Sequence, residues 1–470
     1  MRAHEAGALH AEGYGGPPWL ALPADVNALL PGLWASSVSR SPAGVLTVGG
    51  VDVEALAEEF GTPAYVVDET DFRSRATGFR TAFADAFADL CGGADVYYAG
   101  KAFLCTAVAR WVSEEGLFLD TSTGGELAVG LRAGVPPSRM GLHGNNKADD
   151  EIRAALEAGV GRIIVDSAEE VGRVAGLARA AGVRAPVLVR VTVGVEAHTH
   201  SYIATAHEDQ KFGIPMDAVP AVVADVLARP ELELLGLHSH IGSQIFDTSG
   251  FEVAARRVLQ LHAAVQASHG VRLPELDLGG GFGIRYTSQH DPLPVEELAG
   301  GMATIVGHEC RALGIDVPRI SVEPGRAIAG PSTFTLYRVG TVKDVELDGG
   351  ARRRYIAVDG GMSDNVRTAL YDADYSCTLA SRASDAPPVL SRVVGKHCES
   401  GDIVVKDEFL PGDVSRGDLV AVPATGAYCR SLASQYNHVP RPPVVAVRDG
   451  SARVIVRRET IDDILALDTP

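Results

Sequence analysis

Short apolar segments alternate with alanine-rich segments between residues 71 and 331, and this alternation constrains the fold more than any other feature of the chain. The eight apolar segments are residues 95–98, 117–120, 139–143, 162–166, 186–191, 234–238, 275–278 and 319–323. Between them, segments such as 151–158 and 168–181 carry apolar residues three and four positions apart, as on one face of a helix. Continuous apolar runs are typical of buried parallel strands, which need crossover helices. The pattern therefore predicts an α/β fold with a (β/α)8 TIM barrel at residues 71–331.

Chemically capable side chains or glycines follow most of these predicted strands. In chain order they are Lys101, Asp120, His143, Asp166, His240, Gly279 to Gly281, and Glu323. In a TIM barrel the carboxyl ends of all eight strands meet on one face, and that face carries the active site. We therefore expect these residues to gather at one site.

The rest of the chain predicts a second domain. After residue 331 the helical spacing stops, and short strand-like runs appear among glycine, proline and aspartate residues. These runs are residues 355–358, 402–405, 419–422 and 444–447. They favour a β-rich domain, sandwich or barrel, at residues 332–470. The runs at 46–48 and 64–67 predict that residues 46–70 add strands to it, and residues 1–45 read as an N-terminal arm.

Composition narrows the class of protein. Of 470 residues, 60 are acidic and 42 basic, giving a net charge of −18, which argues against nucleic acid or an anionic membrane as a partner. No apolar run is long enough to span a membrane, and residues 1–16 lack the apolar core of a signal peptide. The six cysteines form neither a C-x-x-C pair nor a zinc-type cluster. We expect a cytoplasmic enzyme without a metal.

Two motifs in the predicted barrel suggest chemistry. Lys101 directly follows the first strand, where it could act as a Schiff-base nucleophile or be an ordinary loop lysine. Gly279, Gly280 and Gly281 could bring backbone N–H groups to an anion or simply form a tight turn. They are not part of a nucleotide-binding P-loop sequence.

Two further motifs carry paired polar groups. Glu323 could keep a pyridine nitrogen protonated and Arg326 could bind a carboxylate or phosphate, or the two could form an internal ion pair. His240 could stack on an aromatic cofactor and Ser243 could donate to a phosphate. A histidine buried in the core is the alternative for His240.

The β-rich part has its own candidates. Cys398, between His397 and Glu399, could donate a proton or be a buried small residue. Arg367 and Tyr371 are spaced four apart, so they could bind one carboxylate from a shared helix face or lie on a solvated one.

Together these motifs resemble the barrel-type pyridoxal-phosphate decarboxylases, the alanine racemase-like fold group that includes ornithine, arginine and diaminopimelate decarboxylases. The matching motifs are Tyr98-Ala99-Gly100-Lys101, His240-x-Gly242-Ser243, Asp277-x-Gly279-Gly280-Gly281, Glu323-Pro324-Gly325-Arg326, Cys398-Glu399 and Gly426-Ala427-Tyr428. They follow the family's order and cover the chain from about residue 45 to its end. The resemblance implies pyridoxal 5'-phosphate as cofactor and a homodimer with shared active sites, in which the partner supplies Cys398 and Glu399.

Within this group the details resemble the diaminopimelate decarboxylases. Residues 197–200, 203–205 and 211–213 resemble their loop after the fifth strand, and Glu399 stands where ornithine decarboxylases usually have an aspartate. The implied reaction is decarboxylation of meso-2,6-diaminopimelate at its D-centre, which gives L-lysine and CO2. Residues 1–45 depart from the family pattern.

The resemblance assigns a role to each site residue. Catalytic roles fall to Lys101, Glu323, His240 and Cys398. The cofactor-binding set is Lys101, Asp120, His143, His240, Ser243, Gly279, Gly280, Gly281, Glu323, Gly325, Arg326 and Tyr428. The substrate-binding set is Arg326, Arg367, Tyr371, Glu399 and Tyr428.

Four other readings stay open. A decarboxylase of ornithine, lysine or arginine would share the fold, and a racemase would need a second base, for which Tyr428 is available. A non-catalytic homologue should lack the lysine, the glutamate or the cysteine, and all three are present. A metal-dependent hydrolase could use His238, His240 and Asp120, but it would leave the glycine loop without a role.

Overall fold

The computed structural model describes residues 16–194, 211–346 and 352–469. The chain divides into two compact units. Among the described residues, one unit comprises residues 73–194, 211–283 and 292–328, and the other comprises residues 16–72, 284–291, 329–346 and 352–469. The predicted limits of the arm, the strand-bearing segment and the two domains stay predictions. The predicted loop segments 197–200 and 203–205 lie outside the described residues.

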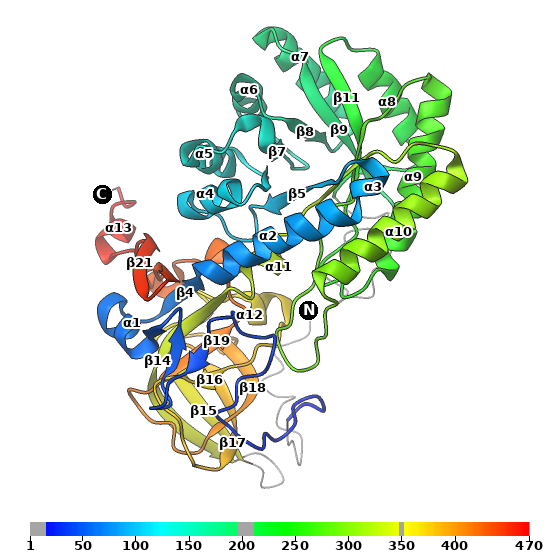
Figure 1. Ribbon diagram of the computed structural model, residues 1–470. Coiled ribbons are helices and arrows are strands. Elements are labelled where there is room, and N and C mark those ends of the chain that lie inside the picture. Colours follow the sequence, from blue (N-terminus) through cyan, green and yellow to red (C-terminus); the bar gives the residue numbers. More distant parts are fainter. Residues whose placement is uncertain (1–15, 195–210, 347–351, 470) are drawn as a thin grey trace. The chain divides into compact units, whose positions relative to one another are not determined.

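The first unit is a closed barrel of eight parallel strands (Figure 1). The strands are β5 (Ala94–Ala99), β6 (Phe118–Thr121), β7 (Met140–Leu142), β8 (Arg162–Val165), β9 (Ala185–Thr192), β11 (Leu232–Ser239), β12 (Glu275–Asp277) and β13 (Arg319–Val322). Each pairs with the next, and β13 closes the ring onto β5 through Ile320 beside Ala94 and Val322 beside Val96. The short β10 (Ile214–Pro215) adds to β9. The predicted TIM barrel is confirmed, with all eight strands where the apolar runs lie.

Helices lie around the outside of these strands (Figure 1). They are α2 (Glu69–Ala86), α3 (Ala88–Cys91), α4 (Thr106–Glu114), α5 (Gly124–Ala133), α6 (Asp149–Ala158), α7 (Ala168–Ala181), α8 (Val219–Leu227), α9 (Ser249–His269), α10 (Val295–Leu313) and α11 (Arg326–Ala329). Local sequence sets their ends. Before α7, the Ser167 side chain accepts the Glu170 N–H, and after it Gly182 adopts a left-handed φ of 68°.

The second unit is rich in antiparallel strands. Its larger sheet contains β4 (Ala64–Asp68), β14 (Thr333–Glu346), β15 (Arg352–Val358), β16 (Thr378–Leu379), β17 (Pro388–Val394), β18 (Ile403–Pro411), β19 (Leu419–Pro423), β20 (Val444–Arg448) and β21 (Ser451–Val456). The N-terminal strand β4 lies between β14 and β20, antiparallel to the first and parallel to the second. This confirms that N-terminal residues add a strand to the β-rich fold.

The run at 46–48 behaves differently from the run at 64–67. It forms β2 (Leu46–Val48), which pairs with β1 (Ser39–Arg40) and β3 (Val51–Asp52) in a small sheet of its own. A hydrogen bond from the Leu46 N–H to the carbonyl of Ala380, the residue after β16, ties this small sheet to the rest of the unit. The described part of this unit also contains the short α-helices α1 (Val53–Phe60), α12 (Arg367–Tyr371) and α13 (Ile461–Leu465).

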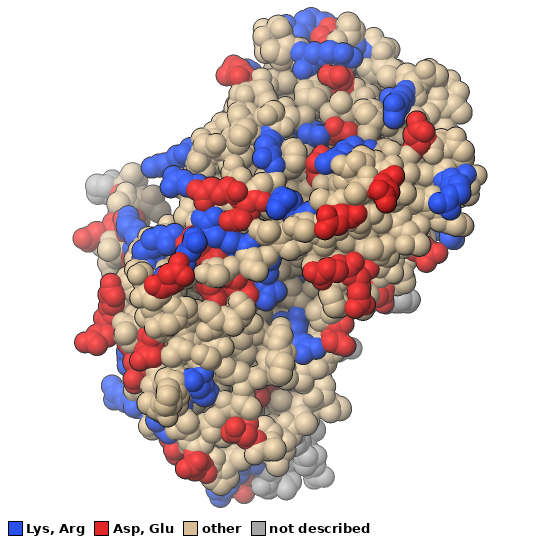
Figure 2. All heavy atoms as spheres, viewed as in Figure 1, with Lys and Arg blue, Asp and Glu red and all other residues tan. Residues whose placement is uncertain are grey.

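On the face drawn in Figure 2, acidic and basic side chains are interspersed, so the negative net charge forms no single patch there. Among the described residues, no helix combines the length and the apolar character needed to cross a bilayer.

Candidate active site

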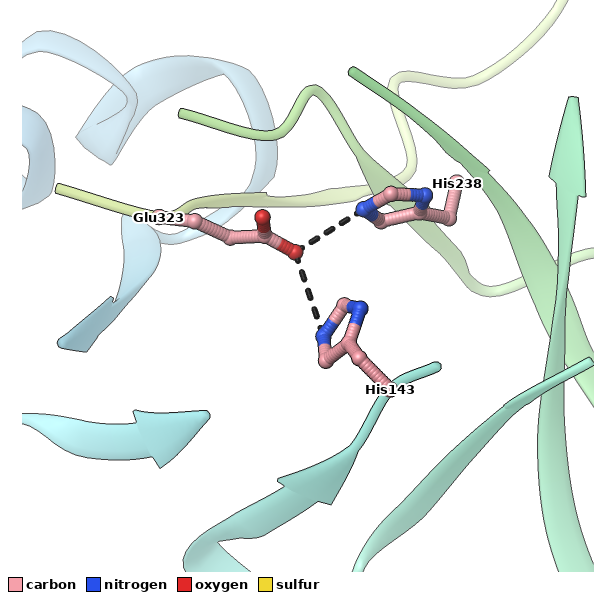
Figure 3. Close-up of side chains that lie close together, drawn as sticks. All are labelled: His143, His238 and Glu323. Atoms are coloured by element: carbon pink, nitrogen blue, oxygen red, sulfur yellow. Dashed lines mark hydrogen bonds and ion pairs between the residues drawn. The ribbon is translucent and has the colours of Figure 1, made fainter. Parts of the chain in front are cut away.

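Glu323 lies at the centre of a buried polar cluster at the carboxyl ends of the barrel strands (Figure 3). It directly follows β13, and one of its oxygens, Oε1, meets two imidazoles. Nε2 of His238, from the end of β11, lies 2.9 Å from it, and Nε2 of His143, just after β7, lies 3.3 Å from it. The closed ring of strands thus brings three distant segments onto one carboxylate oxygen.

Asp120 extends this cluster from the end of β6. Its Oδ1 lies 3.2 Å from Nε2 of His143. The neighbouring strand makes room for it with a glycine, since a Cβ on Gly141 would lie 2.8 Å from Asp120 Oδ1. The Asp120 carboxylate can therefore lie beside β7 because residue 141 has no side chain.

Burial makes ionisation costly for these carboxyl groups. It raises the pKa of Glu323 to about 7, an effect that Asp120 reinforces and His143 opposes. Burial likewise raises the pKa of Asp120 to about 7, against the charge of Lys101. The pKa of His238 is held well below its usual range, chiefly by burial. A positively charged group placed beside Glu323 would therefore lower the pKa of this carboxyl group and stabilise its ionised form.

His240 is fixed by the glycine loop. The Gly280 N–H donates to His240 Nδ1 at 3.2 Å, which leaves the proton of the neutral ring on Nε2. Burial also holds the pKa of His240 well below its usual range, with the charge of Lys101 adding to the effect. The imidazole is therefore a neutral ring in a set orientation, as a stacking partner requires.

The glycine loop after β12, residues 279–281, lies so close to neighbouring backbone that side chains on it would clash, and we call it the glycine cradle. A Cβ on Gly279 would lie 2.4 Å from the Ser239 carbonyl, one on Gly280 2.2 Å from the Glu323 carbonyl, and one on Gly281 2.5 Å from the Gly242 carbonyl. Gly279 and Gly281 also have left-handed φ values of 71° and 105°. Only glycine permits this approach of backbone segments.

Next to the cradle lies a cationic group. Arg326 is buried and begins α11, and its Nη2 donates to Ser243 Oγ at 2.8 Å. Gly325 lies in close contact with β5, because a Cβ there would lie 2.9 Å from the Ala99 carbonyl oxygen. A guanidinium, a hydroxyl and a glycine-lined backbone together match the donors that a phosphate needs.

Lys101 is exposed and follows β5 after a single glycine. The Gly100 N–H donates to the Asp120 carbonyl, which fixes the backbone before the lysine. The lysine's charge lowers the pKa of Asp120 and Glu323 against the effect of burial. An accessible amine beside buried carboxyls and an anion cradle fits a carbonyl-bearing, phosphorylated aromatic cofactor.

The same groups include a set of metal-ligand type. One nitrogen from each of His143 and His238 and one oxygen of Glu323 lie within 4.8 Å of one another. The hydrolase reading named His238 with His240, but the structure joins His238 to Glu323 and His240 to Gly280. The sequence pattern therefore identified the right strand ends but missed the part played by His238.

In the β-rich unit, Cys398 is the exposed thiol of the six cysteines, all of which are free. Its backbone N–H donates to Asn437 Oδ1 at 3.2 Å, and the His397 backbone N–H donates to Asp402 Oδ2 at 2.7 Å. The Glu399 carboxylate accepts the Gly401 N–H at 3.3 Å. The segment is thus held through its backbone while the thiol stays accessible.

Arg367 and Tyr371 are the first and last residues of α12 and differ in burial. Both belong to α12, but Arg367 is buried and its Nη1 donates to the Tyr375 hydroxyl at 2.6 Å, with its guanidinium 4.8 Å from the Tyr286 ring centre. Tyr371 is 37% exposed. Tyr428 is partly buried and has a left-handed φ of 63°, which is strained for a side chain of its size.

Known proteins share both the sequence and the fold. The sequence model of the family described as "Pyridoxal-dependent decarboxylase, pyridoxal binding domain" matches residues 73–330. Diaminopimelate decarboxylase of Mycobacterium tuberculosis (strain ATCC 25618 / H37Rv) is 56% identical over 446 residues, which cover 94% of this chain and 98% of the relative. The chain belongs to the diaminopimelate decarboxylase family. This family membership confirms the resemblance stated from the motifs and makes the chain a pyridoxal-phosphate-dependent carboxy-lyase.

Solved structures support the family at the level of fold. A diaminopimelate decarboxylase from M. jannaschii, in co-complex with L-lysine, has a TM-score of 0.86 and 28% identity, covering 93% of this chain and 98% of that one. A lysine/ornithine decarboxylase from Vibrio vulnificus, complexed with cadaverine, has a TM-score of 0.70 and 23% identity, covering 84% and 97%. The second likeness shows the fold alone.

Proposed function

We propose that this chain decarboxylates meso-2,6-diaminopimelate at its D-centre and so produces L-lysine and CO2. One observation carries the chemistry: the buried Glu323 carboxylate at the end of β13, beside a glycine cradle and the Arg326–Ser243 pair. The substrate class is supported by the 56% identity to a diaminopimelate decarboxylase over nearly the whole chain.

The barrel residues fit pyridoxal 5'-phosphate. The backbone of Gly279, Gly280 and Gly281, with Ser243 and Gly325, would hold its phosphate, and Tyr428 is proposed to add a hydroxyl. Lys101 would hold its carbonyl carbon, and His240 would lie on its ring. When bound, the cofactor supplies an electron sink for the pair left behind when CO2 departs.

Glu323 would keep the proton on the ring nitrogen, because an anionic carboxylate favours the charged form of a neighbouring base. His143 and Asp120 would hold that carboxylate in place. Cys398 would return a proton to the α-carbon, for which its accessible thiol is suited. The residues thus orient the ring, keep it charged and complete the proton balance.

The distal end of the substrate is proposed to meet Arg326, Arg367 and Tyr371 at its carboxylate, and Glu399 at its amino group. The guanidinium of Arg367 is preorganised for this contact, because it donates to the Tyr375 hydroxyl and lies over the Tyr286 ring. Ornithine and arginine lack a carboxylate at that end, so a guanidinium there would select for diaminopimelate.

We further propose a cytoplasmic homodimer in which the partner subunit lends its cysteine and glutamate to each site. Six free thiols suit a reducing compartment. A mixture of Lys101→Ala and Cys398→Ala chains, unfolded and refolded together, should recover part of the activity that each variant alone lacks. Recovery no greater than the sum of the two alone would contradict shared sites.

Product analysis tests the reaction itself. Purified protein with added pyridoxal phosphate would be given meso-diaminopimelate, ornithine, lysine or arginine, and CO2 and amine products would be measured. We expect lysine and CO2 from diaminopimelate only, and no turnover by Lys101→Ala. Release of putrescine from ornithine or agmatine from arginine would overturn the substrate while keeping the cofactor site.

A further inference from the structure

His238 is a buried histidine whose hydrogen bonding is one-sided. Its side chain lies at the end of β11 and is 1% exposed. Nε2 lies 2.9 Å from Glu323 Oε1. Nδ1 is also buried and has no hydrogen-bond partner among the described residues. The ring therefore makes one strong polar contact, and it makes it to the carboxylate proposed to face the cofactor's ring nitrogen.

This asymmetry decides where the ring proton lies. With the proton on Nδ1, a buried N–H donor would be left unsatisfied and Nε2 could only accept from a protonated Glu323. With the proton on Nε2, the ring donates to Glu323 and leaves only a bare lone pair at Nδ1. Burying an unsatisfied lone pair on an imidazole costs less free energy than burying an unsatisfied N–H, so the tautomer with the proton on Nε2 is favoured.

A neutral donor has a particular effect on Glu323. Hydrogen bonds to an anion are stronger than those to a neutral group, so the Nε2–H stabilises the ionised carboxylate without adding a charge of its own. His143 approaches the same oxygen at a longer distance of 3.3 Å and also faces Asp120 at 3.2 Å. His238, in contrast, directs its Nε2 to Glu323 alone among the carboxylates of this cluster.

We propose that His238 is a positioning residue that orients Glu323 and keeps it anionic, so that the cofactor's ring nitrogen stays protonated. The inference rests on the proposed role of Glu323. His238 is not among the residues proposed to touch substrate or cofactor, and it acts on the cofactor through Glu323.

The test compares the apoprotein's affinity for pyridoxal phosphate with its affinity for the 1-deaza analogue, which has carbon in place of the ring nitrogen. His238→Gln places an amide N–H where Nε2 stands, and His238→Asn is one methylene too short to do so. We expect His238→Asn to weaken pyridoxal phosphate about 10- to 100-fold. The affinities of wild type and His238→Asn for the analogue should differ by no more than about threefold. His238→Gln should restore the preference for pyridoxal phosphate over the analogue.

Two controls separate the possible causes. His262→Leu alters an equally buried histidine on α9 and should leave the ratio of the two affinities unchanged. Glu323→Gln should abolish the wild-type preference for the ring nitrogen; if it does not, the proposed role of Glu323 itself is wrong. Equal losses for both ligands in His238→Asn, or no loss for either, would overturn the positioning role. Because no substrate is used, the outcome does not depend on which amino acid the enzyme decarboxylates.

Discussion

Gly280 faces the backbone of Glu323 so closely that a Cβ at Gly280 would lie 2.2 Å from the Glu323 carbonyl oxygen. Gly280→Ala must therefore move the glycine loop or the end of β13, and both belong to the proposed cofactor site. We expect the variant to lose at least about 2 kcal/mol of stability through overpacking and to bind pyridoxal phosphate far more weakly.

Gly176→Ala is the matched control for that substitution. Gly176 lies inside α7, and a Cβ there would meet nothing within 4 Å. It should raise the free energy of unfolding by up to about 1 kcal/mol, because alanine is the better helix former, and leave cofactor affinity unchanged. Urea unfolding and cofactor titration measure both variants. Normal affinity in Gly280→Ala would show that the loop does not need its close approach.

Replacing Glu323 by glutamine should separate cofactor binding from turnover. The amide keeps the shape but cannot hold the ring nitrogen charged, so we expect kcat to fall about 100- to 1000-fold even when pyridoxal phosphate is supplied at a concentration that saturates the variant. Cofactor absorbance and steady-state kinetics measure this. Glu309→Gln, a buried carboxyl on α10 that pairs with Arg256, should keep kcat within about twofold of wild type.

The raised pKa of Glu323 predicts a pH-dependent stability of the apoprotein. The group titrates near 4.5 when unfolded and near 7 when folded. Between these values the folded state binds more protons, so the free energy of unfolding falls as pH rises, by at most about 3 kcal/mol from this group. Glutamine does not titrate. From pH 5 to pH 8, wild-type apoprotein should therefore lose more stability than Glu323→Gln in urea unfolding, and parallel losses would refute this.

Arg367 can be tested with two ligands that differ at one end. L-lysine keeps a carboxylate at its amino acid centre, whereas cadaverine has none. Arg367→Ala should weaken inhibition by lysine about 10- to 100-fold and leave cadaverine nearly unaffected. Arg353→Ala removes another buried arginine of the same unit, the partner of Asp407, and should lower stability without changing the ratio of the two inhibition constants. An unchanged ratio in Arg367→Ala would exclude the proposed carboxylate contact.

The barrel could be predicted because its signal is local. Each strand is a continuous apolar run, and each helix carries its own cap, as with Ser167 and Gly182 around α7. The long strand β14 was missed because its burial changes along its length: its first residues are buried, while several of residues 338–346 are exposed. No single apolar period describes such a strand.

Contacts made across the chain were the least predictable part of the site. Within a strand sequence His238 reads as a core residue, and its contact with Glu323, 85 positions away, exists only because the ring of strands closes. The spacing of Arg367 and Tyr371 left open a shared carboxylate site and a solvated helix face, because the spacing alone does not show what packs on the helix. In the structure α12 is five residues long, and the rings of Tyr286 and Tyr375 lie against the guanidinium of Arg367.

The seam between β13 and β5 has a consequence for synthesis of the chain. Lys101 follows the first barrel strand and Glu323 follows the last, so the amine is made early and the carboxylate only after 222 further residues. A ribosome-bound chain that ends before β13 contains Lys101 but lacks Glu323 and the strand that joins β12 to β5. We therefore expect the proposed Lys101 and Glu323 contacts to the cofactor to come together only after β13 has been made and the barrel has closed.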